Sequence, residues 1–285
     1  MPADSGKVRY FPPRDRVMHN GVTRTLAILG CGSAGQATEF GQRKRNKTKV
    51  TPEIELLEGE VHAWIEPLTW TAALLAEARA TLSKEENERA DRFVQDIHRN
   101  RYLISHLKLR KILAKYLTSK PRELQFEVTE FGKPFLAASD NPAQINFNLS
   151  HSNERMLLGV VRDANIGVDI EEIRPEAATL DIAARFFTAR ENQELRSLSG
   201  REQVEAFFNC WTRKEAYLKA IGFGLSIDPK DCEVSLLPTA SPKLFKTLYP
   251  GHDEEGRWSL FRLSHLGYSC AVAIDKPSYL SQKSG

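Results

Sequence analysis

Three acidic residues stand where the chain should be burying apolar side chains, and two of them are close neighbours. The stretch NIGVDIEEI, residues 165–173, is typical of a strand, and residues i and i+2 of a strand face the same side. Asp169 and Glu171 therefore project together. Two adjacent carboxylates repel each other unless a proton or a cation intervenes. Oxygen ligands suit Mg²⁺ or Mn²⁺, so we predict a divalent cation at this pair.

The third acid is Glu215, in REQVEAFFNCWTRKEAYLKAIGFGL. Spacings of three and four predict one apolar helix face, made of Val204, Phe208, Trp211 and Leu218. Glu215 completes this stripe, where a lone carboxylate is costly unless it is paired or metal-bound. The alternative is an intrahelical ion pair with Lys219 at i+4. We expect Glu215 to join the other two acids.

Basic residues near these motifs could bind phosphate oxygens, because Lys and protonated His donate to them. They are Lys133 in FGKPFL, His151 in NLSHS, and Lys214 and Lys219 on either side of Glu215. Each has an ordinary alternative: a turn lysine before proline, a capping histidine, or solvated helix lysines. Together with three acids, they predict a site for a metal ion and a pyrophosphate.

The elements that position these residues follow in two similar series. Strand patterns at 61–68, 124–130, 145–151 and 156–162 surround helical patterns at 71–95, with a break near Ser83, and at 98–117. The second series has strand patterns at 165–171, 232–237, 257–263 and 268–274, with helices near 179–197 and 201–221. We therefore predict an α+β fold of two similar halves packed with pseudo-twofold symmetry. The halves span residues 59–164 and 165–278, with a tail at 279–285.

The first 58 residues differ from the rest. They are polar and rich in Pro and Gly, which predicts a poorly ordered extension. Within them LAILGCGSAGQA matches a dinucleotide-binding fingerprint at Gly30, Gly32 and Gly35. The context is poor, because only four apolar residues precede it and no good helix pattern follows. The basic run 43–49 is typical of a solvated tail, with nucleic-acid or membrane-surface binding as the alternative.

Bulk composition narrows the function. Of 285 residues, 41% are hydrophobic and the net charge is +3, all of it contributed by residues 1–60. The remaining chain is charge-neutral, which argues against a nucleic-acid-binding protein. Four widely separated cysteines fit a reducing cytoplasm. No apolar run approaches the ~20 residues of a membrane span. We therefore expect a soluble, cytoplasmic protein that binds neither nucleic acid nor membranes.

The order of these motifs resembles that of the 4′-phosphopantetheinyl transferases of the surfactin-activating (Sfp) type. The shared stretches are FGKPFL, FNLSHSNERMLLGVV, IGVDIEEIRP, ARFFTARE and FFNCWTRKEAYLKAIGFGL, within residues 60–275. The resemblance implies a monomer with coenzyme A in a cleft between the halves. By position, it implies Mg²⁺ ligands at Asp169, Glu171 and Glu215. It implies coenzyme contacts at Lys133, Ser150, His151 and Lys219, with Arg101 at the 3′-phosphate. We add Lys214 to the candidate coenzyme contacts because it lies beside Glu215 in the sequence.

The implied reaction moves the phosphopantetheine arm of coenzyme A onto a serine of an apo acyl or peptidyl carrier protein, releasing adenosine 3′,5′-bisphosphate. Lys219 and His151 would stabilise the leaving group, and Glu215, directly or through a metal-bound water, would accept the serine proton. Ser150 is not a nucleophile in this scheme, because the attacking serine belongs to the partner.

Three alternatives remain at this stage. A metal-dependent nuclease or nucleotidyl transferase also uses acids and lysines, but it would need a basic groove. A catalytically inactive carrier-binding module would not need an intact acid triad. A nicotinamide-dependent oxidoreductase would depend on the Gly30 segment, so deletion of residues 1–58 would abolish its activity.

Overall fold

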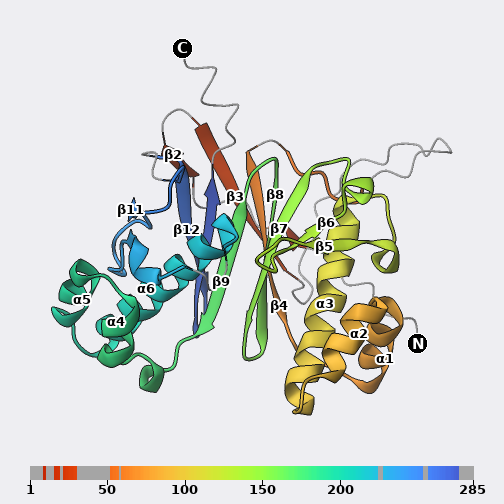
Figure 1. The fold of residues 1–285 in the computed structure, drawn as a ribbon, viewed down its shortest axis with the longest axis horizontal. Coiled ribbons are helices and arrows are strands. Elements are labelled where there is room, and N and C mark those ends of the chain that lie inside the picture. Colours follow the sequence, from red (N-terminus) through yellow and green to blue (C-terminus); the bar gives the residue numbers. More distant parts are fainter. Residues whose placement is uncertain are drawn as a thin grey trace.

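The computed structural model describes residues 9–10, 16–19, 22–30, 52–57, 59–223, 227–252 and 256–275. Two halves lie side by side, with their long strands in the middle and their helices on the outer sides (Figure 1). One outer side carries α1–α3 and the other carries α4–α6. This arrangement brings strand 145–152 of the first half next to strand 166–172 of the second. Most of the predicted site residues lie on or near these two strands.

Each half contains the same elements in the same order: a strand, three α-helices, a short pair of strands and a long hairpin. The first half comprises β4 (Glu60–Pro67), α1 (Ala72–Thr81), α2 (Lys84–Asp91), α3 (Asp96–Tyr116), β5 (Phe126–Val128), β6 (Pro134–Leu136), β7 (Ile145–Ser152) and β8 (Arg155–Arg162). The second comprises β9 (Ile166–Glu172), α4 (Leu180–Phe186), α5 (Ala189–Arg196), α6 (Gly200–Ile221), β10 (Cys232–Val234), β11 (Leu244–Thr247), β12 (Trp258–His265) and β13 (Tyr268–Asp275). The predicted fold class is confirmed.

Capping residues divide the helical stretches of each half. Ser83 begins α2 with a capping box in which its hydroxyl accepts from the Glu86 amide and the Glu86 carboxylate accepts from the Ser83 amide. Thr188 and Glu191 do the same at α5. The break predicted near Ser83 is confirmed, whereas the single helix predicted over 179–197 is wrong. The Thr188 box ends α4 and starts a new helix, because a capping side chain satisfies amides that a continuous helix would bond internally.

The central seam between the halves is made by side chains. In the first half β4, β8 and β7 pair antiparallel, and in the second β12, β13 and β9 do so. β7 and β9 lie next to each other without a mutual ladder. Instead the Val168 amide donates to Asn148 Oδ1 at 2.8 Å, and the Glu172 amide donates to Ser152 Oγ at 3.1 Å.

Part of the N-terminal segment extends the first sheet. β1 (Arg9–Tyr10) and β2 (Arg16–His19) pair with β3 (Val22–Gly30), and β3 pairs in parallel with β4. These strands fall in the region predicted to be poorly ordered. Gly32, Gly35, the basic run 43–49 and the tail 279–285 lie outside the described residues.

Four apolar clusters hold the described residues together, and the smallest of them packs α1 and α2 against α3. One packs α4–α6 against the second sheet, and another packs α3 against the first. The third draws on both sheets, with Val61 and Leu157 from one half and Val168, Ile170 and Val272 from the other. The two halves therefore share a core.

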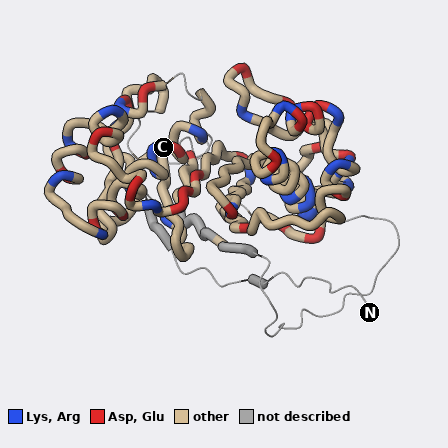
Figure 2. Tube along the Cα trace, turned by 90° about the horizontal axis from the view of Figure 1, so that it is seen from below, with Lys and Arg blue, Asp and Glu red and all other residues tan. Residues whose placement is uncertain are grey.

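No helix in the described part of the chain is both long and apolar enough to span a bilayer. Figure 2 shows acidic and basic residues interspersed along both halves rather than separated onto two faces.

Candidate active site

Strand β9 divides its side chains between the shared core and the long helix α6. Val168 and Ile170 are fully buried in the core cluster common to both sheets. Asp169 and Glu171, one residue out of phase, lie on the opposite face of the strand, as the alternation predicts. Ile170, which lies between these two acids in the sequence, is completely buried, as expected for a strand residue that points inward.

Close contact between β9 and α6 brings the remaining site residues to this face. A Cβ atom added at Gly167 would lie 2.0 Å from the Ala216 carbonyl oxygen and 2.3 Å from the Ala220 amide nitrogen. Only glycine fits there, because both obstacles are backbone atoms. The close approach sets the α6 side chains Glu215 and Lys219 beside the acids of β9.

Asp169 is the centre of the site. It is 2% exposed, and its Oδ1 accepts from Lys219 Nζ at 2.5 Å and from Ser150 Oγ at 2.9 Å. Lys219 Nζ also donates to Ser150 Oγ at 3.1 Å. The second carboxylate oxygen of Asp169, Oδ2, is buried and has no hydrogen-bond partner. A buried carboxylate oxygen without a donor carries a desolvation cost that a bound cation would relieve.

The other two acids are held in a state that favours a proton or a cation. Glu171 Oε2 accepts from Ser152 Oγ at 2.9 Å. Burial, followed by repulsion from Asp169 and Glu215, raises the pKa of Glu171. Burial and then Asp169 raise the pKa of Glu215, although Lys219 counteracts this. The three carboxylates therefore interact with one another electrostatically.

These residues fit a divalent cation by donor type and by the unpaired Asp169 oxygen. Among the described residues, no group of three or more His, Cys, Asp or Glu side chains is arranged so that it could hold a metal ion as it stands. The ammonium of Lys219 supplies the positive charge next to Asp169. The ligand roles of Asp169, Glu171 and Glu215 therefore stay predictions.

Basic groups from the first half approach the same site from α3 and β7. His151 is exposed at its edge, and its pKa is lowered by partial desolvation and then by the positive charge of Lys219, with smaller effects from Arg101 and His98. Arg101 donates through Nη2 to Asn153 Oδ1, while its Nε is buried without a partner. Several basic side chains close together, one of which has an N–H group without an acceptor, are typical of an anion-binding site.

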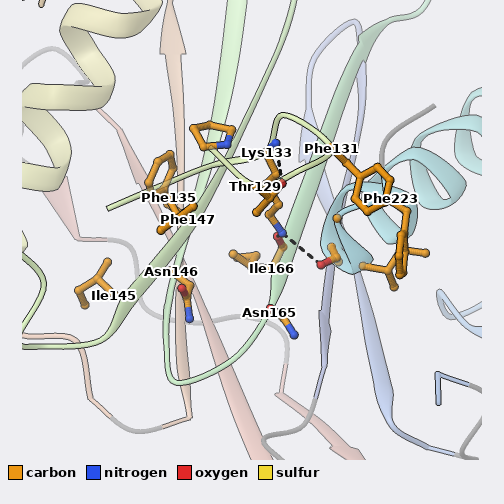
Figure 3. A pocket seen from close by; sticks show the side chains of 14 residues that line it. Thr129, Phe131, Lys133, Phe135, Ile145, Asn146, Phe147, Asn165, Ile166 and Phe223 are labelled. Atoms are coloured by element: carbon orange, nitrogen blue, oxygen red, sulfur yellow. Dashed lines mark hydrogen bonds between the residues drawn. The ribbon is translucent and has the colours of Figure 1, made fainter. Parts of the chain in front are cut away.

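Lys133 lies in an adjoining pocket rather than beside the acids. Its ammonium donates to the carbonyl oxygens of Ile166 at 2.9 Å and Ala220 at 3.1 Å, which ties the first half to β9 and α6 (Figure 3). Burial lowers the pKa of Lys133 to about 8. At the pocket rim the rings of Phe131 and Phe223 lie 5.1 Å apart.

Lys214 is placed away from the acids, although sequence put it with them. It is 2% exposed, and its ammonium contacts Glu191 Oε2 at 2.8 Å, the Pro229 carbonyl oxygen at 2.8 Å and the Cys232 carbonyl oxygen. An ammonium has three donors, and these three acceptors use them all.

Two polar residues of the site were missed from sequence. Ser152 and Asn148 lie on the same face of β7 as Ser150, and both bond β9. The period of two along FNLSHS was the signal that pointed to them.

Acidic and basic side chains at the seam of a two-part α+β fold suit a transferase or hydrolase of phosphorylated substrates. Comparison with known proteins narrows this. Residues 165–273 match the profile of the 4′-phosphopantetheinyl transferase superfamily, and residues 69–160 match that of the 4′-phosphopantetheinyl transferase N-terminal domain. The 4′-phosphopantetheinyl transferase HetI of Nostoc sp. is 40% identical over 193 residues, which are 68% of this chain and 81% of that protein.

Two further proteins are similar to parts of this chain. The 4′-phosphopantetheinyl transferase Sfp of Bacillus subtilis is 32% identical over 51% of this chain and 62% of its own length. A solved holo-(acyl-carrier-protein) synthase from Bacillus anthracis is 26% identical over 40% of this chain and 96% of that one, with a TM-score of 0.34. The chain belongs to the 4′-phosphopantetheinyl transferase superfamily. The predicted family and enzyme class are confirmed.

Proposed function

We propose that this chain transfers the 4′-phosphopantetheine arm of coenzyme A to a serine of an apo acyl or peptidyl carrier protein, in a reaction that requires Mg²⁺. The buried, unpaired Oδ2 of Asp169, set among two further acids with raised pKa values, is the observation that carries this proposal. Family membership supplies the substrate class.

The phosphates of coenzyme A are bound, in this proposal, by the basic groups around the seam. Lys219 lies within hydrogen-bonding distance of both Asp169 and Ser150, so it can shift towards a phosphate without leaving the site. His151 and Arg101 hold the phosphates on the side of the first half. The unused Nε–H of Arg101 provides one donor for the 3′-phosphate.

Mg²⁺, with Mn²⁺ as a substitute, would be held by Asp169, Glu171 and Glu215 and would supply charge neutralisation at the pyrophosphate. The incoming serine oxygen forms a bond to the phosphorus that carries the pantetheine arm. The phosphoanhydride bond breaks, and its electron pair leaves with adenosine 3′,5′-bisphosphate, where Lys219 and His151 stabilise the charge.

Glu215 accepts the serine proton. Burial and then Asp169 raise the pKa of its carboxyl group before Mg²⁺ binds, and the carboxylate oxygen that does not bind Mg²⁺ remains able to accept a proton. No serine of this chain acts as a nucleophile, and the hydroxyl of Ser150 donates to Asp169.

The three described cysteines, Cys210, Cys232 and Cys270, are free thiols, which supports a cytoplasmic location. The alternatives raised from sequence have no comparable support. In the described part of the chain, acidic and basic positions are interspersed along both halves (Figure 2).

The proposal is tested by incubating the full chain with coenzyme A, Mg²⁺ and apo carrier proteins of fatty-acid, polyketide and nonribosomal-peptide type. Intact-mass measurement should show the addition of one phosphopantetheine group to at least one carrier, and chelation of Mg²⁺ should stop it. Failure to modify any of several unrelated carriers refutes the proposal. Retained transfer after deletion of residues 1–58 would exclude a reaction that depends on the Gly30 segment.

A further inference from the structure

The ion pair between Glu191 and Lys214 joins four segments of the second half. Glu191 Oε2 accepts from the Thr188 amide at 2.7 Å and from Lys214 at 2.8 Å, while its Oε1 accepts from the Val234 amide at 2.8 Å. Lys214 in turn bonds the carbonyl oxygens of Pro229 and Cys232. The start of α5, the middle of α6, the Pro229–Asp231 turn and β10 are thereby fixed to one another.

The first half contains the same arrangement. Glu86, the capping-box acid of α2, accepts from the Ser83 amide at 2.8 Å and from Arg110 Nη2 at 2.6 Å. Arg110 Nη1 donates to the carbonyl oxygens of Pro121 at 3.0 Å and Leu124 at 2.9 Å, on either side of the Pro121–Glu123 turn. Both pairs link a capping box, a long helix and a turn that begins with proline.

The repeat extends to the neighbouring asparagine. Asn87 Nδ2 donates to the carbonyl oxygens of Arg79, Leu82 and Ser83. Asn192 Nδ2 donates to those of Ala183, Phe187 and Thr188. A device found in both halves, including the one without the acid cluster, belongs to the fold rather than to substrate binding.

The two halves differ in the residue that follows the buried basic side chain of this arrangement, Arg110 in the first half and Lys214 in the second. After Arg110 comes Lys111, which pairs with Glu77 on the surface. After Lys214 comes Glu215, which enters the acid cluster. Consecutive helix residues point ~100° apart, so an anchor at Lys214 sets the direction in which Glu215 leaves the helix.

We propose that the Glu191–Lys214 pair is a positioning device that holds Glu215 beside Asp169, and that Lys214 makes no contact with coenzyme A. This inference rests on the proposed function, because Glu215 matters only if the transfer takes place. It assigns Lys214 to support of the reacting groups rather than to phosphate binding.

The test compares Lys214→Met and Lys214→Arg with the matched first-half variant Arg110→Met. Turnover and KM for coenzyme A are measured on the full chain with Mg²⁺ and apo carrier, well below the melting temperature of each variant. Lys214→Met should lower kcat by about 10²-fold, as expected for a misplaced reacting group, with KM for coenzyme A changed less than about threefold. Lys214→Arg should recover at least about tenfold of that loss, because Arg110 fills the same role.

Arg110→Met should lower the melting temperature similarly and change kcat by less than about threefold. A raised KM with unchanged kcat in Lys214→Met would show that Lys214 binds the coenzyme. An equal loss of kcat in Arg110→Met would show that the Glu191–Lys214 pair contributes only to the overall stability of the protein. Either outcome overturns the inference. If Lys214→Met does not fold, Glu191→Gln takes its place in the comparison, because it keeps the acceptor for Val234.

Crystal structures of Lys214→Arg and of the Lys214→Met or Glu191→Gln variant give a readout that is independent of turnover. Glu215 should keep its position in the arginine variant and move in the other. An unmoved Glu215 in both overturns the inference. A wild-type protein that modifies no carrier refutes the proposed function instead.

Discussion

Gly167 offers the sharpest test of how the site is built, because it controls the distance between β9 and α6. A Cβ at this position would lie 2.0 Å from the Ala216 carbonyl oxygen, whereas ordinary contacts begin near 3.4 Å. In Gly167→Ala the helix must therefore move by about 1.4 Å, the difference between these distances. Overpacking costs about 1–3 kcal/mol of unfolding free energy, and displacement of Glu215 and Lys219 by ~1 Å costs about 10²-fold in turnover.

The matched control is Gly159→Ala on β8, which approaches the other face of β9. There the new Cβ would meet methyl groups of Val168 at 2.5 Å and Ile166 at 2.7 Å, both on side chains of the shared core. It should lose stability without moving α6. Denaturant unfolding gives stability, and kcat with coenzyme A and apo carrier gives function. If Gly167→Ala folds and turns over at the wild-type rate, or if Gly159→Ala loses as much turnover, the reasoning is refuted.

The remaining predictions concern the acids. Glu215→Gln should lower kcat by about 10²–10⁴-fold without lowering the melting temperature, since it removes a base and a repelled charge, and calorimetry should show retained coenzyme binding. Asp169→Asn should raise the Mg²⁺ concentration needed for turnover, and an unchanged Mg²⁺ titration counts against its ligand role. Because the folded pKa values of Glu171 and Glu215 are raised, their stabilising contribution is present below pH 4.5 and lost as pH rises through the raised values. The Mg²⁺-induced gain in melting temperature should therefore grow as the pH rises above 4.5.

Most of the helices and strands could be predicted from local sequence patterns. Alternation in NIGVDIEEI placed Asp169 and Glu171 on one face and Ile170 in the core, which the burial of β9 confirms. The helix that carries Glu215 and the strands of both hairpins also follow their patterns. The division at Thr188 was missed, although Thr188 and Glu191 have capping-box spacing.

The long-range partners of the lysines could not be read from their spacing. Lys214 and Lys219 are both close to Glu215 in sequence, yet Lys219 contacts Asp169 and Lys214 contacts Glu191. Helix periodicity alone points the two side chains about 140° apart, but the partner that each one meets depends on how α6 packs against β9 and α5, which is a property of tertiary packing. Lys133 likewise looked like a phosphate ligand, and its two carbonyl partners come from the other half of the fold.

The seam between β7 and β9 has a consequence for how this architecture can change. The hydrogen bonds of a backbone ladder persist when side chains change. Asn148 and Ser152, in contrast, bond the neighbouring strand through their side chains, which a single substitution can remove. Single substitutions there can therefore alter the spacing of β7 and β9 while leaving each sheet intact. Engineering that aims to accommodate a bulkier donor or a different acceptor has its natural starting point at these two side chains.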